Sequence, residues 1–239
     1  MRIEVDKFNS VIFGLKMGNV VDCSETIKAE DVRDMILNAK SNGFQHLNAK
    51  VSADKKEAVN ILLQNGFKLV DTQLMYQINV RISEERWPDN LIFRNYRKDD
   101  CVQIADIARE AYTLDQFHSD KELPSYLCDK YYVEWMNNSC NGFADKVMVL
   151  SRDAAVTGYI TINYENGHSA VVGLAAIGKR YRNKGYFTCL IGETLKMLFE
   201  EGVTRMMYGT QLVNRPALHT MSRYSGIPIY SNHILHRIV

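Results

Sequence analysis

Apolar positions in the first third of the chain change repeatedly between helical and strand-like spacing. Apolar residues recur on one helix face over 31–39, and the segment 44–51 that follows has the pattern of a strand. A second helix is predicted over 58–63 and ends at Asn65-Gly66, after which a long alternating strand covers 67–80. We therefore expect helix, strand, helix and strand in this order.

A charged stretch without apolar periodicity lies between residues 81 and 90 and contains Pro88. Such a stretch is typical of a linker, so we place a domain boundary there. The prediction is a small N-terminal α/β half-domain over 1–85 and a main domain over 86–239.

The main domain is expected to mix strands and helices. Asn166-Gly167 is a hairpin signal between two of its strands, because these residues tolerate a positive φ. The order is strand, two helices, three strands, helix, strand, helix and strand, over 91–96, 102–111, 126–136, 147–150, 158–164, 170–177, 187–198, 204–212, 217–223 and 227–237. This order predicts an α/β fold of the α+β type with a mixed sheet.

Two segments share one strand–helix–strand pattern. Segment 44–80 and segment 204–237 both contain a strand, a helix, a glycine directly after the helix, and a second strand. Units of this kind often look alike without common origin. The shared position of the glycine favours a partial duplication.

Charge and composition exclude several classes of protein. The 239 residues are 46% hydrophobic and 24% charged, and 29 Lys and Arg against 28 Asp and Glu leave a net charge of +1. Nucleic-acid binding needs a basic surface that this balance does not provide. No apolar run approaches the ~20 residues of a membrane span, and the first residues lack a signal-peptide core. We expect a cytoplasmic protein with no nucleic-acid or membrane partner.

The cysteines indicate neither disulfides nor a metal site. Their number is odd, they are widely scattered and none forms a C-x-x-C pair, so they are interpreted as small core residues; they are Cys23, Cys101, Cys128, Cys140 and Cys189. His233 and His236 lie three apart on a predicted strand and therefore face opposite sides. No metal is expected.

One stretch carries the chemistry of an anion site. An apolar strand ends at Ile177, a basic turn with glycines covers 178–185, and a helix with an apolar face follows from Phe187. A helix N-terminus presents unpaired N–H groups and a positive dipole end to a phosphate. Arg182 and Lys184 add charge, so we expect a pyrophosphate here. Neither a Walker loop nor a G-x-G-x-x-G fingerprint occurs in the sequence.

The run Tyr181-Arg182-Asn183-Lys184-Gly185 resembles the R/Q-x-x-G-x-G/A signature of the GNAT acyltransferases. The resemblance implies acetyl-CoA as cosubstrate, with its pantetheine arm on the strand that ends at Ile177 and its pyrophosphate at the turn. Phe187 stands where the family usually has Gly or Ala. The cofactor-binding residues implied are Ala176, Ile177, Arg182, Asn183, Lys184, Gly185, Tyr186, Phe187 and Asn214, the last also capping a helix.

The same resemblance implies a tyrosine that protonates the departing CoA thiolate. The segment 210–226 is similar to the family's N-x-x-A-x-x-L-Y-x-K-x-G-F, and strict spacing puts Met221 at the tyrosine. Tyr224 lies three residues further and shares part of the same helix face, so it is our candidate general acid. A half-buried packing residue is the alternative interpretation of Tyr224.

The acceptor side is also suggested by resemblance. Phe117-His118-Ser119-Asp120, residues 134–147, residues 8–18 and Thr72-Gln73 resemble the bacterial TDP-fucosamine acetyltransferase type of GNAT, which extends the likeness over nearly the whole chain. It implies a dTDP-linked amino sugar as the acceptor amine. His118 is then a candidate base, and His118, Ser119 and Asp120 are candidate substrate-binding residues.

Two other functions remain open at this stage. A GNAT enzyme could acetylate another small amine or a protein N-terminus. The chain could also be a non-catalytic CoA-binding module, because Met221 and Phe187 depart from the residues that the family usually has at these positions. The sequence does not determine the oligomeric state, and a homodimer is compatible with it.

Overall fold

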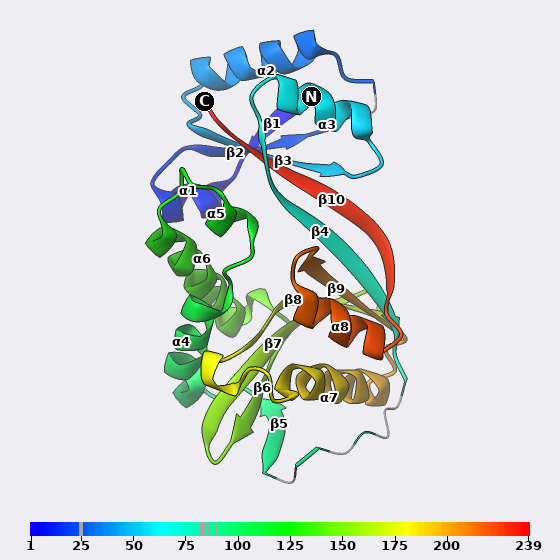
Figure 1. Ribbon diagram of the computed structural model, residues 1–239. Helices are drawn as coiled ribbons and strands as arrows, with labels where there is room; N and C mark the ends of the chain where they lie inside the picture. The colour runs from blue at the N-terminus through cyan, green and yellow to red at the C-terminus, as the bar shows by residue number, and fades with distance from the viewer. Residues whose placement is uncertain (24–25, 82–84, 86, 89) are drawn as a thin grey trace. The chain divides into compact units, whose positions relative to one another are not determined.

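The computed structural model describes residues 1–23, 26–81, 85, 87, 88 and 90–239. Its elements form a mixed α/β fold (Figure 1). The strands are β1 (Arg2–Val5), β2 (Met17–Val21), β3 (His46–Ser52), β4 (Lys68–Asn79), β5 (Leu91–Asn95), β6 (Lys146–Arg152), β7 (Ala155–Glu165), β8 (Ser169–Ile177), β9 (Arg205–Gln211) and β10 (Ile227–Ile238). The helices are α1 (Lys7–Phe13), α2 (Ala29–Ser41), α3 (Lys56–Gln64), α4 (Cys101–Ala111), α5 (Gln116–Ser119), α6 (Ser125–Asn138), α7 (Tyr186–Glu200) and α8 (Arg215–Arg223). Parallel and antiparallel pairs both occur, which confirms the predicted fold class.

The chain forms two compact units. Unit 1 consists of Met1–Leu74, Leu114–Cys128 and Tyr230–Val239, and unit 2 consists of Met75–Thr113 and Asp129–Ile229. Strands β4 and β10 therefore have residues in both units. The division into domains at 1–85 and 86–239 stays a prediction, and part of the segment on which it rests lies outside the described residues.

Unit 1 is a sheet with two helices packed on one face. Strand β2 is parallel to β3, β1 is antiparallel to β2, and β10 is antiparallel to β3, in the order β1-β2-β3-β10-β4. Because side chains alternate along a strand, every second residue of β3 faces α2 and α3. Leu47, Ala49 and Val51 fill this core with apolar residues of both helices, among them Val32, Ala39, Ala58 and Leu62.

The other face of the unit 1 sheet carries polar side chains. His46, Asn48 and Lys50 alternate with the core residues of β3, and His236 on β10 lies opposite Asn48. Phe117 of α5 reaches this region and lies against Phe13 of α1, with ring centroids 5.2 Å apart. The segment 114–128 thus packs beside a partly polar sheet face.

Unit 2 contains an antiparallel meander of β5, β6, β7 and β8. Strand β9 follows parallel to β8, and the unit 2 residues of β4 are next to β9. Helices α4 and α7 both contact β7 and β8. The meander delivers the end of β8 directly to the turn before α7.

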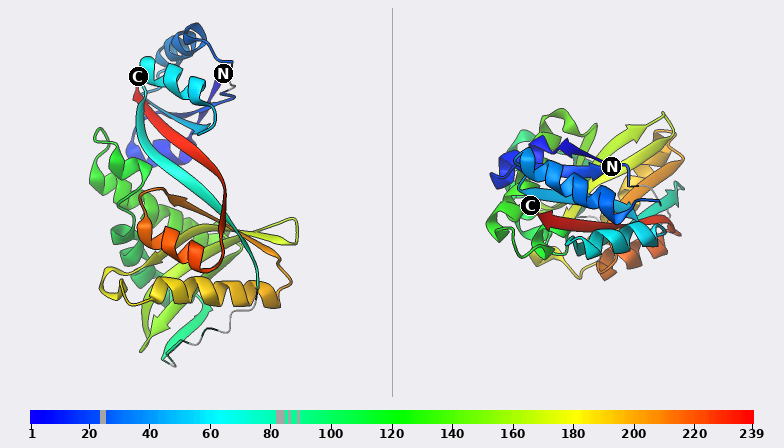
Figure 2. Two further views of the ribbon diagram at one scale, coloured as in Figure 1. Left: turned by 45° about the vertical axis from the view of Figure 1, so that its right-hand side comes forward. Right: turned by 90° about the horizontal axis from the view of Figure 1, so that it is seen from above.

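The predicted similarity of two segments is confirmed at the level of secondary structure. The first is β3-α3-β4 and the second is β9-α8-β10, and each ends in a strand of 12 residues. In unit 1, β10 lies between β3 and β4, and in unit 2, β4 adjoins β9. Figures 1 and 2 show the two long strands, teal and red, side by side. A partial duplication stays a prediction.

Two hairpin turns have positive φ angles at adjacent residues. Asn166 and Gly167 have φ of 52° and 68°, as predicted, but Glu165 pairs with Ser169, so the loop has three residues. Asp153 and Ala154, with φ of 49° and 67°, form a two-residue turn between β6 and β7. The sequence signal was weaker at the second turn because alanine rarely adopts a positive φ.

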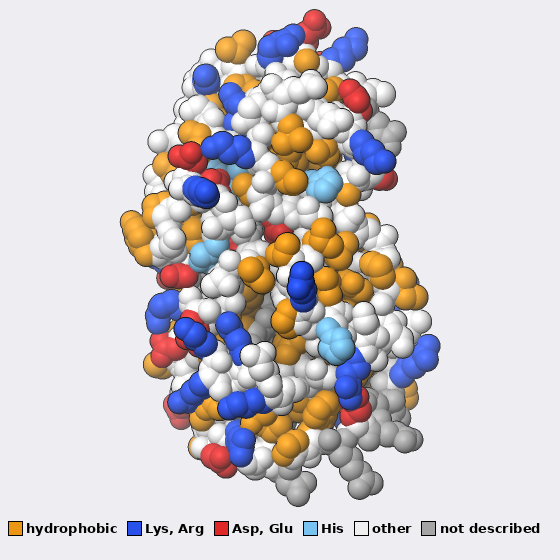
Figure 3. Space-filling model, viewed as in Figure 1, with side chains coloured by type: hydrophobic (Ala, Val, Ile, Leu, Met, Phe, Trp, Pro, Cys, Tyr) orange, Lys and Arg blue, Asp and Glu red, His pale blue; other side chains and the backbone are white. Residues whose placement is uncertain are grey.

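Charged side chains of both signs are interspersed on the face shown in Figure 3. This distribution agrees with the net charge of +1. All five cysteines are free thiols, and Cys128 and Cys189 are buried, as expected for small core residues. In the described part of the chain, none of the helices is long and apolar enough to cross a membrane.

Candidate functional site

The two central strands of unit 2 separate where a ligand arm is expected. Strand β9 pairs with β8 only from Ser169 to Val172, opposite Arg205 to Tyr208, whereas β8 remains paired with β7 as far as Ile177. Among the described residues, 173–177 therefore have no strand partner on the β9 side, while Ala175 to Ile177 pair with β7 beyond an irregularity at Gly173 and Leu174. An extended chain can bond to the edge on the β9 side, as an added strand would.

The register decides which N–H groups face that open edge. Gly178 donates its N–H to the Thr157 carbonyl (2.9 Å), and Ala176 lies opposite Tyr159. Because N–H groups alternate in direction along a strand, the N–H of Ala176 points to β7 and those of Ala175 and Ile177 point away from it. Of the two expected cofactor-binding residues on β8, Ile177 therefore presents its N–H to the open edge and Ala176 does not, and Ala175 presents a second N–H there.

The turn after β8 leads to an uncapped helix. Gly185 is the N-cap of α7, with φ of 78°, and Asn183 also has a positive φ of 61°. No side chain caps the first turn of this 15-residue helix. Its first N–H groups, together with the positive dipole end, are thus available to an anion. The open edge of β8 and this helix end are joined by the turn at 178–185.

Arg182 is committed to the protein backbone. Its Nε donates to the Ile177 carbonyl (3.1 Å), and its Nη2 donates to the carbonyls of Glu110 (3.3 Å) and Ala111 (3.4 Å) at the end of α4. Its side chain therefore ties the turn to the ends of β8 and α4. Lys184 makes one bond, to the Arg180 carbonyl (3.1 Å), and is otherwise exposed.

Aromatic side chains occupy the region where β8 and β9 separate. Tyr208 is the last β9 residue paired with β8, and its ring lies 6.2 Å from that of Phe187 in the first turn of α7. Tyr112 and Tyr159 share a hydrogen bond of 3.0 Å between their hydroxyls. Burial raises the pKa of all three phenols well above the ordinary value. They are protonated at neutral pH and can donate a proton.

The sequence did not single out these three tyrosines. Tyr112 follows a predicted helix, and Tyr159 and Tyr208 lie within predicted strands, where aromatic residues are common in any core. Only the pairing of β7, β8 and β9 shows that they belong together.

Tyr224 is held between two acceptors. Its hydroxyl lies 2.9 Å from the Thr188 carbonyl of α7 and 2.8 Å from a Glu85 carboxylate oxygen. Burial, with Glu85 beside it, raises the pKa of this phenol. The contacts connect the end of α8 to α7 and favour the packing role that the sequence left open. Asn214 caps α8 as predicted, accepting from the Ala217 N–H (3.4 Å).

The residues expected on the acceptor side belong to unit 1. His118 is mostly buried, and its Nδ1 lies 2.6 Å from the Asp115 carboxylate. Ser119 is exposed. Asp120 is buried and contacts His46 (3.1 Å) and His236 (2.8 Å). The Asp120 carboxylate is therefore in contact with protein side chains and not exposed to solvent. The remaining expected site residues, including Tyr224, belong to unit 2.

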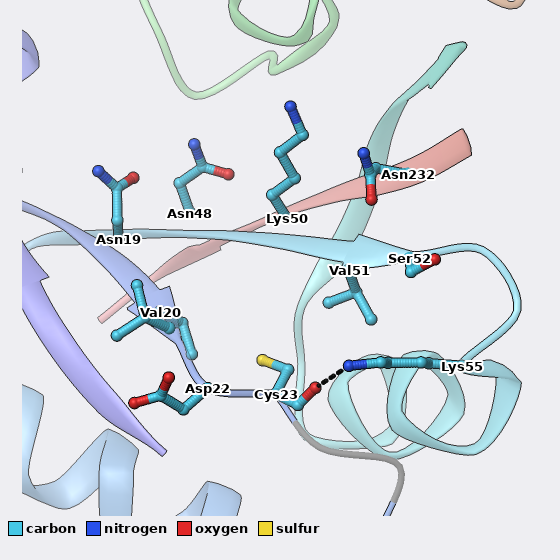
Figure 4. Close-up of a pocket in the computed structure, with 11 residues that line it drawn as sticks. Asn19, Val20, Asp22, Cys23, Asn48, Lys50, Val51, Ser52, Lys55 and Asn232 are labelled. Atoms are coloured by element: carbon cyan, nitrogen blue, oxygen red, sulfur yellow. Dashed lines mark hydrogen bonds between the residues drawn. The ribbon is translucent and has the colours of Figure 1, made fainter. Parts of the chain in front are cut away.

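A cavity of about 590 Å³ opens at one end of the unit 1 sheet (Figure 4). Several polar side chains project from the same side of the strands, namely those of Asn19, Asn48, Lys50 and Asn232. Lys55 lies at the start of α3 and donates to the Cys23 carbonyl (2.9 Å). Burial lowers the pKa of the Lys50 ammonium. Amide groups, the two lysines Lys50 and Lys55 and the carboxylate of Asp22 suit a polar ligand. Among the described residues, the cavity lining includes the N-cap of α3, Lys55, but not the basic glycine turn found in unit 2.

Comparisons with solved structures agree on the fold. A GCN5-related N-acetyltransferase from Sphaerobacter thermophilus is 12% identical and covers 87% of this chain with a TM-score of 0.65; this chain covers 66% of it, slightly less than two thirds. A tandem GNAT protein from the clavulanic acid biosynthesis pathway is 12% identical, with 94% and 76% of the two chains covered and a TM-score of 0.64.

A third similar structure is a GCN5-related glucosamine N-acetyltransferase region of a fungal multi-domain β-N-acetylglucosaminidase. It is 12% identical and has a TM-score of 0.66, and the match covers 98% of this chain and 30% of the fungal chain. Among curated proteins, none matches the sequence.

The model of the acetyltransferase (GNAT) family matches residues 101–226, which is more than half of the chain. The match includes β8, the turn at 178–185, α7, β9 and α8. These are the elements that form the open strand edge and the uncapped helix end. The chain therefore belongs to the GNAT family of acetyltransferases, a family of acyltransferase enzymes.

Proposed function

We propose that this protein transfers an acetyl group from acetyl-CoA to the primary amine of a dTDP-linked amino sugar by direct attack. The observation that carries the proposal is the continuous path from the open edge of β8 at residues 173–177 to the uncapped N-terminus of α7. GNAT enzymes generally use acetyl-CoA. Its extended pantetheine arm is suited to the open strand edge, and its pyrophosphate is suited to the helix N-terminus.

In this proposal the backbone does most of the binding. The N–H groups of Ala175 and Ile177 bond to the arm and polarise the thioester carbonyl, an interaction that strengthens as negative charge develops on its oxygen. The turn residues Asn183 and Lys184 and the first N–H groups of α7 bind the pyrophosphate. Arg182 acts through the turn, because its own hydrogen bonds go to backbone carbonyls.

The departing thiolate needs a proton, and we propose Tyr208 as its source in place of Tyr224. Tyr208 lies where β8 and β9 separate, and burial keeps its phenol protonated. Tyr224 already lies within hydrogen-bond distance of Thr188 and Glu85. General acids contribute about 10²-fold or more to a rate.

The two tyrosines make a matched pair of variants. We expect Tyr208→Phe to lower kcat by about 10²-fold with little change in acetyl-CoA affinity, since the lost contact forms in the transition state. Tyr224→Phe should keep kcat near the wild-type value and lower thermal stability. A large loss of kcat in Tyr224→Phe, with kcat unchanged in Tyr208→Phe, would identify Tyr224 as the general acid, which is the candidate that the sequence predicted.

The choice of acceptor rests on two likenesses. The stretch Phe117-His118-Ser119-Asp120 resembles the TDP-fucosamine acetyltransferase type, and a protein of similar fold is a glucosamine N-acetyltransferase. Both suggest an amino sugar. Asp120 is buried, whereas Ser119 is exposed, so Ser119 is the better candidate for acceptor contact.

The proposal is tested by following release of the CoA thiol with acetyl-CoA and a panel of amines. A dTDP-amino sugar should react with the highest kcat/KM, against free amino sugars, polyamines and peptides with a free N-terminus. A higher kcat/KM with peptides or polyamines would contradict the proposed acceptor but still support acetyltransferase activity. Stabilisation by acetyl-CoA without turnover on any amine would indicate a binding module.

A further inference from the structure

Three potential metal ligands meet inside unit 1. His46 on β3, His236 on β10 and Asp120 after α5 are 0%, 2% and 5% exposed. The Asp120 Oδ2 atom lies 3.1 Å from His46 Nε2 and 2.8 Å from His236 Nδ1. One ligand atom from each residue lies within 4.8 Å of the others.

The sheet register explains how two distant histidines come together. On β10, Ile238 lies opposite His46, and His236 lies opposite Asn48. Residues two apart on a strand share a face, so His46 and His236 are diagonal neighbours on the same face. The segment 114–128 brings Asp120 against them. His233, three residues before His236 on the same strand, faces the opposite side, as predicted.

With a neutral His236, the hydrogen-bonding cluster is one hydrogen short. A neutral imidazole carries one N–H. His236 faces the Asp120 carboxylate with Nδ1 and the Gln116 Oε1 atom with Nε2 (3.3 Å), so both neighbours require a hydrogen from it. Asn48 Nδ2 lies 3.4 Å from the same Gln116 oxygen, in the geometry of a donor to an acceptor.

We propose that His46, Asp120 and His236 bind a zinc ion. A cation on His236 Nδ1 leaves the single proton on Nε2, where it bonds to Gln116, an outer partner of the kind that orients metal-bound histidines. Asp120 Oδ1 accepts from the Glu122 N–H (3.1 Å), which orients the carboxylate from its other side.

The ligand set and spacing fit zinc. Two imidazole nitrogens and a carboxylate oxygen bind Zn²⁺ at about 2.0–2.2 Å in a tetrahedral arrangement, which separates ligand atoms by roughly 3.3 Å. The observed separations of 2.8 and 3.1 Å need a small outward shift of the side chains. Asp115, which is also buried, is close enough to interact electrostatically with His236 and adds a second negative charge.

The ion would fix segment 114–128 to strands β3 and β10 within unit 1. This role is structural, because all three ligands are buried, and it is independent of acetyl transfer. Zinc binding to the folded chain alone stabilises that state.

The test measures zinc in the purified full-length protein by mass spectrometry. We expect about one equivalent per chain, and a lower Tm after chelation that returns when Zn²⁺ is added. His46→Gln and His236→Gln should each lose the metal and the response to chelator. His233→Gln is the matched control, since His233 lies on β10 as well but bonds to Thr72 (3.0 Å).

Wild-type protein alone can decide the question if the variants fail to fold. The three protein ligands leave the fourth position to a water molecule, so replacement with Co²⁺ should give the visible absorption of a four-coordinate site with nitrogen and oxygen ligands. Wild-type protein that contains no zinc after expression in zinc-supplemented medium, and whose Tm does not respond to Zn²⁺, would overturn the proposal. The cluster would then be a hydrogen-bonded one in which Gln116 donates to His236. Loss of zinc from His233→Gln as well would also contradict the assignment.

Discussion

Replacing Arg182 with alanine separates two roles for the most prominent cation of the turn. The sequence suggests a direct bond from its guanidinium to phosphate. In the structure the guanidinium donates to the carbonyls of Ile177, Glu110 and Ala111. These contacts predict that Arg182 stabilises the turn before any ligand is bound.

The magnitude follows from the number and length of these bonds. A hydrogen bond to a charged group contributes about 1.5–3 kcal/mol at good geometry. Two of the three distances exceed 3.2 Å and the side chain is exposed, so we take about 1–2 kcal/mol for the whole set. For a chain of this size that corresponds to a Tm lower by roughly 2–8 °C. Acetyl-CoA affinity should fall by roughly 5–30-fold as the turn loosens.

The assay is thermal unfolding without ligand, combined with calorimetric titration of acetyl-CoA at two salt concentrations. We expect Arg182→Ala to lower the Tm of the free protein and to weaken acetyl-CoA binding by a similar factor at both salt concentrations. Lys184→Ala is the control: it should leave the Tm unchanged and weaken binding mainly at low salt, because an exposed ammonium acts through screened charge. An unchanged Tm for Arg182→Ala, with a strongly salt-dependent loss of affinity, would refute the structural role.

Three further predictions concern other parts of the chain. Gly185→Ala should lower stability by about 1 kcal/mol through its positive φ, since no atom lies within 4 Å of the added carbon, and should weaken acetyl-CoA binding; unchanged calorimetry would contradict this. Burial raises the pKa of Asp71 to about 6, so its ionisation costs stability as the pH rises through that value. Asp71→Asn should stabilise the protein by about 1–3 kcal/mol at pH 8 and by less at pH 5, measured by urea unfolding; equal effects at both pH values would exclude this cause. Residues 1–85 should bind no CoA, so titration should give one CoA per chain, and a ratio of two would contradict it.

Much of the fold could be predicted from the sequence because it depends on local pattern. The spacing of apolar residues predicted α2, α3, α4, α6 and α7 and most strands, and Asn166-Gly167 marked a hairpin. The turn at 178–185 could be predicted as a candidate anion site from the sequence because its features are consecutive in the chain. The elements β1, α1 and β2 were not predicted, because short elements give little periodic signal.

Features that depend on pairing between distant segments are determined only by the tertiary structure. The register of β7 and β8 assigns the open-edge N–H groups to Ala175 and Ile177, and a register cannot be derived from one strand alone. The hydrogen bonds of Tyr224 and Arg182 depend on Glu85 and Glu110, both far away in sequence.

The same distinction explains the histidine cluster. The sequence alone determined that His233 and His236 face opposite sides of one strand, because side chains alternate along a strand. His236 meets His46 because β10 pairs with β3, and Asp120 reaches them on a third segment. Which residues share a face is a local property fixed by backbone geometry, whereas which faces meet depends on burial and strand pairing across the whole chain.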